Sequence, residues 1–133
     1  MNASIFKSYN IRGIYPGEID EDTAYRIGRA TAQHFSLRTV AVGRDIRESS
    51  PSLFHELARG LAEGGADVLD LGLVTTPMVY FASNRLDVDA AISVTASHNP
   101  PEYNGMKIAL RGALPVGLES GLSEIRDLVT DGS

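Results

Sequence analysis

The sequence lacks several residue types and patterns, and each absence excludes a class of protein. It contains no cysteine, which excludes disulfides, thiolate metal sites and a cysteine nucleophile. No apolar run approaches the roughly 18 residues that a membrane-spanning helix needs. Residues 1–7 also lack the long apolar core of a signal peptide. We therefore expect a soluble, cytoplasmic protein with no membrane partner.

Basic residues are also in short supply. The chain has 12 Lys and Arg against 17 Asp and Glu, and its formal net charge is −5. A general nucleic-acid-binding protein needs a basic face for phosphate contacts, so we expect no nucleic-acid partner. Tryptophan is absent, but 43% of the 133 residues are hydrophobic, which is enough for the core of one modest domain.

Short strand-like runs alternate with helical runs along the chain. This pattern predicts a single α/β domain over residues 1–133, with a mixed, mainly parallel sheet of about four strands flanked by helices. Asn104-Gly105 is a turn signal that indicates one antiparallel neighbour. The expected strands are 39–43, 66–73, 90–94 and 106–110; the expected helices are 20–35, 50–64, 78–85 and 118–129, the last ending near Gly132.

Three helix starts have recognisable capping residues. Asp20 is the expected N-cap of the first helix. Ser50 before Pro51 and Thr76 before Pro77 are the expected cap-plus-proline starts of the second and third helices.

A polar segment, Thr95 to Asn104, follows the expected strand 90–94. Open α/β sheets bind ligands at this edge, although serine, asparagine and proline also form ordinary turns. Ser97 and His98 make a poor hydrolase dyad, because adjacent residues of an extended backbone point to opposite sides and the Gly-x-Ser-x-Gly elbow is missing. The remaining chemical use of Ser97 is a hydroxyl that carries a phosphoryl group.

Several segments together resemble the α-D-phosphohexomutases, and most closely their phosphomannomutase/phosphoglucomutase branch. TASHNP at 95–100, followed by YNGMK at 103–107, resembles the active-site serine loop. The other matching segments are FKSYNIRG at 6–13, VGRD at 42–45 with SSP at 49–51, and GLVTTPM at 72–78. The likeness covers nearly the whole chain in the family's order and implies domain 1 of the phosphohexomutase fold.

The resemblance implies reversible phosphoryl transfer between the 1- and 6-hydroxyls of a hexose, through a phosphorylated Ser97 and a bisphosphorylated sugar. It implies that Ser97, Lys107, Arg12 and His98 are catalytic. Tyr9, Arg12, Ser97 and His98 would bind the substrate. Lys107, one of two lysines, would be a charge partner or a general acid/base. The expected substrates are phosphates of glucose or mannose.

The resemblance also implies Mg²⁺, bound through the phosphate of Ser97 and by an Asp-rich loop of a following domain. No such loop occurs in this chain; Asp87 and Asp89 precede a strand and are interpreted as solvated loop residues. The metal-binding, sugar-binding and phosphate-binding domains are absent from these 133 residues. The expected partners are therefore the downstream domains of the same parent chain, and the fragment alone is expected to be inactive.

Some positions have other interpretations. Asn10 stands where the family usually has aspartate, so a carboxylate that could hold Arg12 is missing. Arg44 and Asp45 are expected to support the serine loop as an internal ion pair, and Asn99 to be a turn former. The same turn role is expected of Asn104, and a structural or surface role of His34 and His55.

Two alternative functions remain. One is a noncatalytic module that binds an anion or a partner, in which Ser97 is never phosphorylated. The other is a domain of the phosphoglucosamine mutase branch, which residues 9–12 and the Pro-Pro-Glu-Tyr stretch after Asn99 make less favoured.

Overall fold

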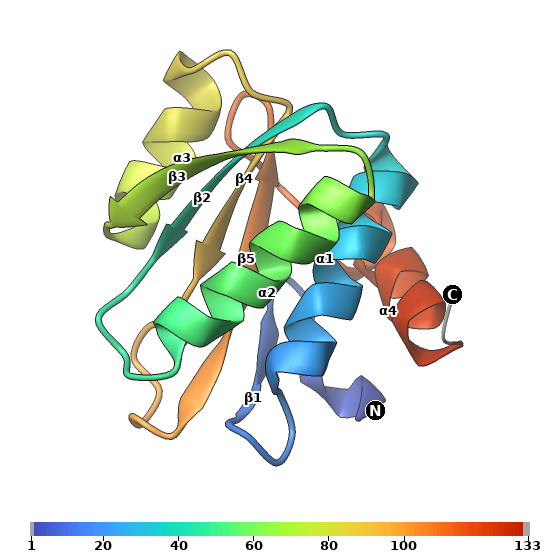
Figure 1. Ribbon diagram of the computed structural model, residues 1–133, viewed down its shortest axis with the longest axis vertical. Helices are drawn as coiled ribbons and strands as arrows, with labels where there is room; N and C mark the ends of the chain where they lie inside the picture. The colour runs from blue at the N-terminus through green and yellow to red at the C-terminus, as the bar shows by residue number, and fades with distance from the viewer. Residues whose placement is uncertain (1, 132–133) are drawn as a thin grey trace.

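A single six-stranded sheet with helices on both faces organises the chain. The computed structural model describes residues 2–131, and its sheet has the order β1-β5-β4-β2-β3, with β6 paired to β5 (Figure 1). The strands are β1 (Ile11–Ile14), β2 (Thr39–Arg44), β3 (Asp67–Leu73), β4 (Ala90–Val94), β5 (Tyr103–Leu110) and β6 (Leu114–Pro115). The helices are α1 (Glu21–Phe35), α2 (Ser50–Glu63), α3 (Thr76–Arg85) and α4 (Leu122–Thr130), with short 3-10 turns at Ala3–Ile5 and Leu118–Ser120.

The mixed sheet was correctly predicted, but it has six strands over residues 2–131 rather than about four. Strand β2 runs parallel to β3 and β4, whereas β5 runs antiparallel to β4, β1 and β6. The two missed strands, β1 and β6, have four and two residues. Such short segments give too few alternations for a period of two to be recognised.

The Asn104-Gly105 pair is not a turn, and this corrects the sequence interpretation. Both residues lie inside β5, opposite Gly13 and Arg12 of β1. A Cβ atom built on Gly105 would lie 1.8 Å from the carbonyl oxygen of Ile11. The glycine therefore permits close approach of β5 and β1. The sheet does contain antiparallel neighbours, as predicted, but Asn104-Gly105 does not form the turn from which this was inferred.

The strands divide their side chains between two cores, and this places the helices. Val40 and Val42 of β2 point into the large core beneath α1, α2 and α4. The intervening Ala41 joins a smaller cluster with Val79 of α3. Because successive strand residues face opposite sides, α3 covers the other face, and the result is a three-layer α/β/α arrangement (Figure 1).

The N-caps were predicted correctly for α1 and one residue late for α2 and α3. Asp20 caps α1 by accepting a hydrogen bond from the Thr23 amide. The N-cap of α2 is Ser49, not Ser50, and the N-cap of α3 is Thr75, not Thr76. The hydroxyl of Ser50 donates to Asp45 instead, and that of Thr76 shares a hydrogen bond with Ser93.

The last helix begins later than predicted. Leu118 lies in a 3-10 turn, and α4 starts at Leu122 after Gly121, whose φ is 133°. The predicted end near Gly132 lies outside the described residues. Over residues 2–131, none of the helices combines the length and the apolar character that crossing a bilayer requires.

Candidate active site

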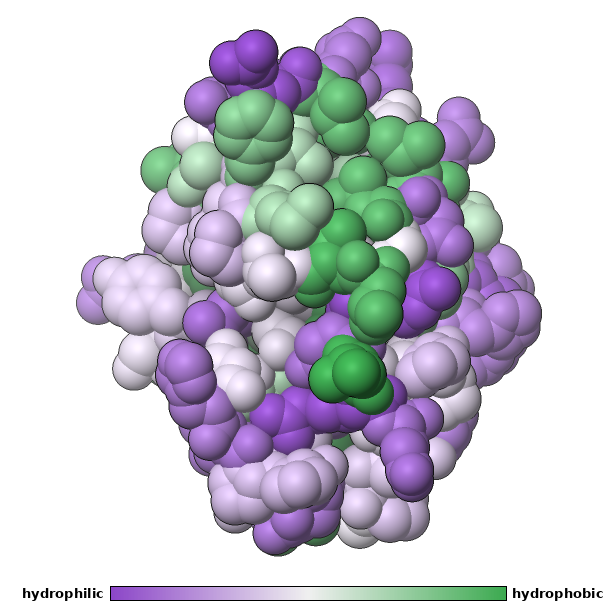
Figure 2. Space-filling view, turned by 90° about the vertical axis from the view of Figure 1, so that its left-hand side faces the viewer, coloured by the Kyte–Doolittle hydropathy of each residue, from purple (hydrophilic) through white to green (hydrophobic). Residues whose placement is uncertain are grey.

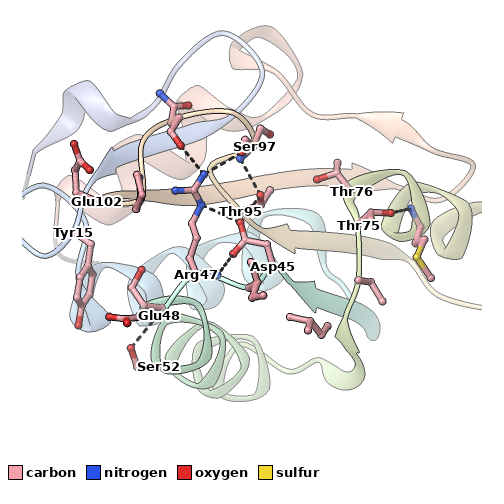
Figure 3. Close-up of a pocket in the computed structure, with 17 residues that line it drawn as sticks. Tyr15, Asp45, Arg47, Glu48, Ser52, Thr75, Thr76, Thr95, Ser97 and Glu102 are labelled. Atoms are coloured by element: carbon pink, nitrogen blue, oxygen red, sulfur yellow. Dashed lines mark hydrogen bonds and ion pairs between the residues drawn. The ribbon is translucent and has the colours of Figure 1, made fainter.

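Three loops meet at the carboxyl ends of β2, β3 and β4, and an open pocket of about 1130 Å³ lies between them (Figure 3). They contribute Asp45 and Arg47 from the first loop, Thr75 from the second, and Thr95 and Ser97 from the third. The polar segment after β4 thus lies where open α/β sheets place their ligands.

Ser97 has an unusual backbone conformation. Its φ is 52°, in the left-handed region that costs an L-residue roughly 1 kcal/mol or more. Its amide donates to Thr95 Oγ1 at 2.9 Å, and the turn closes where the Asn99 amide donates to the Ala96 carbonyl at 3.0 Å. The neighbouring contacts must hold this conformation in place.

Asp45 is the centre of the network beneath the serine loop. Its Oδ1 accepts from the Ser50 hydroxyl at 2.6 Å and from the Arg47 amide at 3.0 Å. Its Oδ2 accepts from the Thr95 hydroxyl at 2.8 Å and from Arg47 Nε at 3.1 Å. Burial by itself would raise the pKa of Asp45, but the hydrogen bonds from Ser50, Thr95 and Arg47 outweigh it and leave the pKa below its usual value.

The expected Arg44–Asp45 ion pair does not form. Arg44 pairs instead with Asp70 at 3.0 Å and lies over the Phe54 ring, 4.6 Å from its centroid. Asp45 pairs with Arg47 at 3.1 Å. β2 ends at Arg44 and the chain bends at Ile46, which brings both the amide and the side chain of Arg47 to the Asp45 carboxylate.

Arg47, which the sequence interpretation missed, is the main support of the serine loop (Figure 3). Its Nη2 donates to the carbonyls of Ser97 and Asn99 at 3.0 and 2.8 Å. Its Nη1 donates to the carbonyls of Pro100 and Tyr103 at 2.7 and 3.2 Å. With Nε on Asp45, all five N–H groups of the guanidinium are used. The Asp-x-Arg spacing after a buried strand was the available signal.

Arg12 reaches the same loop from β1, where it lies opposite Gly105 of β5. Its Nη1 donates to the Ala96 carbonyl at 2.7 Å and to Asn99 Oδ1. Its Nε and Nη2 are buried, and no hydrogen-bond partner for them occurs within residues 2–131. Burial lowers the pKa of Arg12, as does the charge of Arg47, while Asp45 opposes them; from so high an ordinary value, the group stays cationic.

The other predicted site residues occupy different positions around the loop. Lys107 lies half-buried on β5, two residues from Gly105, so it shares a sheet face with Arg12. His98 is exposed beside Ser97. Tyr9 is 66% exposed on the N-terminal loop, and its ring lies against Gly117. The structure joins Arg12 to the loop of Ser97, and the chemical roles of all five residues stay predictions.

Asn99 has more than a turn role, and Asn104 has no turn role. Asn99 closes the turn and also accepts from Arg12. Asn104 is fully buried, and its amide donates to the hydroxyls of Ser49 and Ser50 at 2.8 and 3.0 Å, so the turn interpretation is wrong for it. This bond explains why Ser50 is buried instead of capping α2.

Three remaining residues lie outside this network. The ring of His34 packs edge-on against Phe35 on α1, with the ring centroids 4.7 Å apart. The side chain of His55 is 78% exposed beside Glu56. Asn10 accepts from the Lys7 amide through its backbone carbonyl. Arg12 is held by loop residues, so its two observed bonds do not depend on a carboxylate at position 10.

Asp87 and Asp89 lie at the amino end of β4, at the opposite edge of the sheet from Ser97. The Asp87 side chain is 97% exposed and pairs with Arg111. Asp89 is more than a solvated residue, because it accepts from the amides of Arg38 and Thr39 at 2.8 and 3.2 Å; these bonds lower its pKa. No group of three or more His, Asp or Glu side chains in the described part of the chain could hold a metal ion.

The fold and the serine loop define an α/β/α domain, and comparisons with known proteins specify its family. Residues 3–133 match the family described as phosphoglucomutase/phosphomannomutase, alpha/beta/alpha domain I. A Klebsiella pneumoniae phosphomannomutase is 48% identical over 126 residues, covering 95% of this chain and 80% of that protein. The chain belongs to the phosphoglucomutase/phosphomannomutase family, as the resemblance of its motifs predicted.

Longer relatives show how much of a family protein this chain spans. A phosphomannomutase of Salmonella montevideo is 45% identical over 131 residues, which are 98% of this chain but 29% of that protein. The solved structure of a phosphoglucomutase/phosphomannomutase family protein from Burkholderia thailandensis superposes with a TM-score of 0.88 at 40% identity, covering 99% of this chain and 31% of that one. The chain thus spans under a third of these two relatives.

Proposed function

We propose that this chain is the phosphoserine domain of a longer phosphohexomutase, which interconverts hexose 1-phosphate and hexose 6-phosphate through a bisphosphorylated sugar. The substrates would be glucose or mannose phosphates. The relatives named phosphomannomutase support this branch over the phosphoglucosamine mutases. The other parts of the reaction would come from the metal-binding, sugar-binding and phosphate-binding domains of the parent chain.

The observation that carries the proposal is that the Arg12 guanidinium has buried N–H groups without acceptors within residues 2–131. A buried guanidinium N–H without an acceptor is costly, and Arg12 has such groups on Nε and Nη2. A phosphate is the acceptor that a guanidinium fork matches best. The same side chain already bonds the loop that presents Ser97, so a phosphate that satisfies Arg12 would lie beside this serine.

The proposed step moves one phosphoryl group and leaves the serine free. The bond between phosphorus and Ser97 Oγ breaks, and a bond from phosphorus to a sugar hydroxyl oxygen forms. The hydroxyl proton leaves the sugar, and Ser97 Oγ regains a proton. Lys107, on the sheet face of Arg12, would be the charge partner or general acid/base, and His98 and Tyr9 would contact the substrate.

Within residues 2–131, no group of three or more His, Asp or Glu side chains could hold a metal ion. In the proposal, the phosphate on Ser97 is this chain's one contribution to the binding of Mg²⁺, and the remaining ligands come from another domain. We derive no step through the ion.

An exposed apolar strip supports the presence of further domains in the parent. It runs over β3 and α3 (Figure 2) and includes Leu73, Met78 and Phe81, which are 64%, 54% and 62% exposed. Ile46, beside the pocket, is 86% exposed. Contiguous apolar surface of this kind marks a contact region. A fragment that lacks the covering domains would have no appreciable mutase activity.

The test is the parent enzyme with Ser97→Ala, compared with Ser4→Ala as a control on an exposed serine. Loss of the phosphoryl carrier should reduce kcat on the order of a thousandfold, while Ser4→Ala stays at the wild-type rate. Intact-mass measurement after treatment with a hexose 1,6-bisphosphate should show one added phosphoryl group on Ser97.

Three results would contradict parts of the proposal. Near-normal turnover by Ser97→Ala, with the bisphosphate present, would mean that another residue is the nucleophile. A parent protein that never acquires phosphate on Ser97 would favour the noncatalytic anion- or partner-binding module. Measurable turnover by the isolated 133-residue chain would contradict its expected inactivity.

A further inference from the structure

We infer that Arg47 is a positioning residue for phosphoryl transfer, which fixes the backbone of the serine loop so that Ser97 Oγ is presented in one orientation. The inference rests on the proposed function of Ser97. Arg47 lies on the loop after β2, and its contacts to the loop after β4 are to carbonyl oxygens of the backbone. It therefore acts on the shape of the loop and not on the substrate.

The bonds of Arg47 surround the strained residue. One goes to the carbonyl of Ser97 itself, at 3.0 Å, and the next to the carbonyl of Asn99, at 2.8 Å. The Ser97 amide is fixed by Thr95, whose hydroxyl donates to Asp45, the ion-pair partner of Arg47. Both peptide groups that flank the Ser97 Cα are thus tied to the Asp45–Arg47 pair, which opposes relaxation of its φ of 52°.

Lysine cannot replace this residue. The guanidinium spreads five N–H groups in a plane, and here four of them reach carbonyls of Ser97, Asn99, Pro100 and Tyr103 while the fifth reaches Asp45. An ammonium group has three donors at one point. Arg47→Lys would keep the charge beside Asp45 but leave loop carbonyls without donors, so the loop would sample other conformations.

A loosened loop should affect the chemical step more than substrate binding. Misplacing a reacting group by about 1 Å can cost on the order of 100-fold in rate. We expect Arg47→Lys in the parent enzyme to lower kcat about 100-fold while KM for the hexose phosphate stays within about threefold. Arg59→Lys is the matched control, because Arg59 has no contact with the serine loop: it pairs with Glu56 and Glu63 and lies over the Tyr25 ring on the helices.

Two further measurements separate positioning from simple loss of folding. Hydrogen exchange should be faster at the amides of residues 97–99 in Arg47→Lys, with the amides of β2 and β4 unchanged. In Arg47→Ala, millimolar guanidinium should restore part of kcat, because the small cation can occupy the emptied site. Neither result is expected if Arg47 only stabilises the fold.

The positioning role of Arg47 and the proposed function of Ser97 can fail independently. A normal kcat in Arg47→Lys with unchanged exchange at residues 97–99, or a parallel loss of kcat and of protection in β2 and β4, would overturn the inference. If Ser97→Ala keeps its turnover, the proposed function fails instead. The exchange measurement then still decides whether Arg47 orders the loop.

Discussion

Two arginines donate hydrogen bonds to the serine loop, one from each side of β4 in the strand order, and they differ in how many of their N–H groups have acceptors. Arg47 follows β2 and uses all five N–H groups on acceptors of this domain. Arg12 comes from β1, uses Nη1 alone, and leaves Nε and Nη2 buried without acceptors within residues 2–131. In the strand order β1-β5-β4-β2-β3, Ser97, which follows β4, lies between them.

This difference suggests different roles for the two arginines: Arg47 holds the loop in shape, and Arg12 has N–H groups to offer to a phosphate. The pocket beside Arg47 is also lined by Asp45, Glu48 and Glu102, whose carboxylates repel an anion. The guanidinium of Arg47 has no N–H group left to donate to an anion. Arg12, with its unpaired Nε and Nη2, lies on the same face of the sheet as Lys107. We therefore place the phosphate on the Arg12 side of the serine loop and not against Arg47, because charge and unpaired donors favour that side.

Among the substitutions that test the comparison of the two arginines, Arg12 should give the largest effect. In the parent enzyme, Arg12→Met should lower kcat/KM on the order of 100-fold or more, because charge-assisted bonds to phosphate are lost. Its free energy of unfolding should change by less than about 1 kcal/mol, since the loss of two bonds is offset by removal of unpaired buried N–H groups. Steady-state kinetics and urea unfolding measure the two effects.

The matched variant is Arg47→Met, which leaves Asp45 without its ion-pair partner. Breaking such a pair costs about 3 kcal/mol of unfolding free energy. If Arg12→Met destabilises the protein as much as Arg47→Met does, the distinction between the two arginines is wrong.

A smaller effect is expected at Gly105, which lets β1 bring Arg12 close to the loop. In Gly105→Ala, the added Cβ would lie 1.8 Å from the carbonyl oxygen of Ile11, so β1 must shift. We expect a loss of about 2 kcal/mol in the free energy of unfolding, measured by urea unfolding. Gly17→Ala is the control, since a Cβ there meets no atom within 4 Å. Equal stability of the two variants would contradict the packing argument.

The smallest effect is the pH dependence that arises from Asp45. Its folded pKa is depressed, so its contribution to stability is complete above the unfolded value of about 3.9 and is lost as the pH falls through the folded pKa. The difference in unfolding free energy between wild type and Asp45→Asn, about 1 to 2 kcal/mol at pH 7, should shrink toward pH 3. Urea titrations at both pH values test this, and a constant difference would mean that Asp45 does not titrate as inferred.

The sequence predicted the long elements well and the short ones poorly. Asp20 was recognised as a cap because its side chain bonds three residues ahead along the chain. Ser50 was misassigned because its hydroxyl bonds to Asp45 and Asn104, partners five and more than fifty residues away. The serine loop could be recognised from its motif, whereas the Asp-x-Arg spacing was the one signal for Arg47, because its loop acceptors are backbone carbonyls that any sequence possesses.

By itself, the sequence determined the α/β class and the family, and it supplied Ser97 as the predicted nucleophile, since these depend on local periodicity and on contiguous motifs. The tertiary structure decided which charges pair and which stay free. Arg44 forms an ion pair with Asp70, and Arg47 forms one with Asp45 and also bonds the serine loop. Arg12 has buried N–H groups without acceptors in the described residues. These outcomes depend on strand order and on which face each side chain takes, and both are fixed only when distant segments pack together.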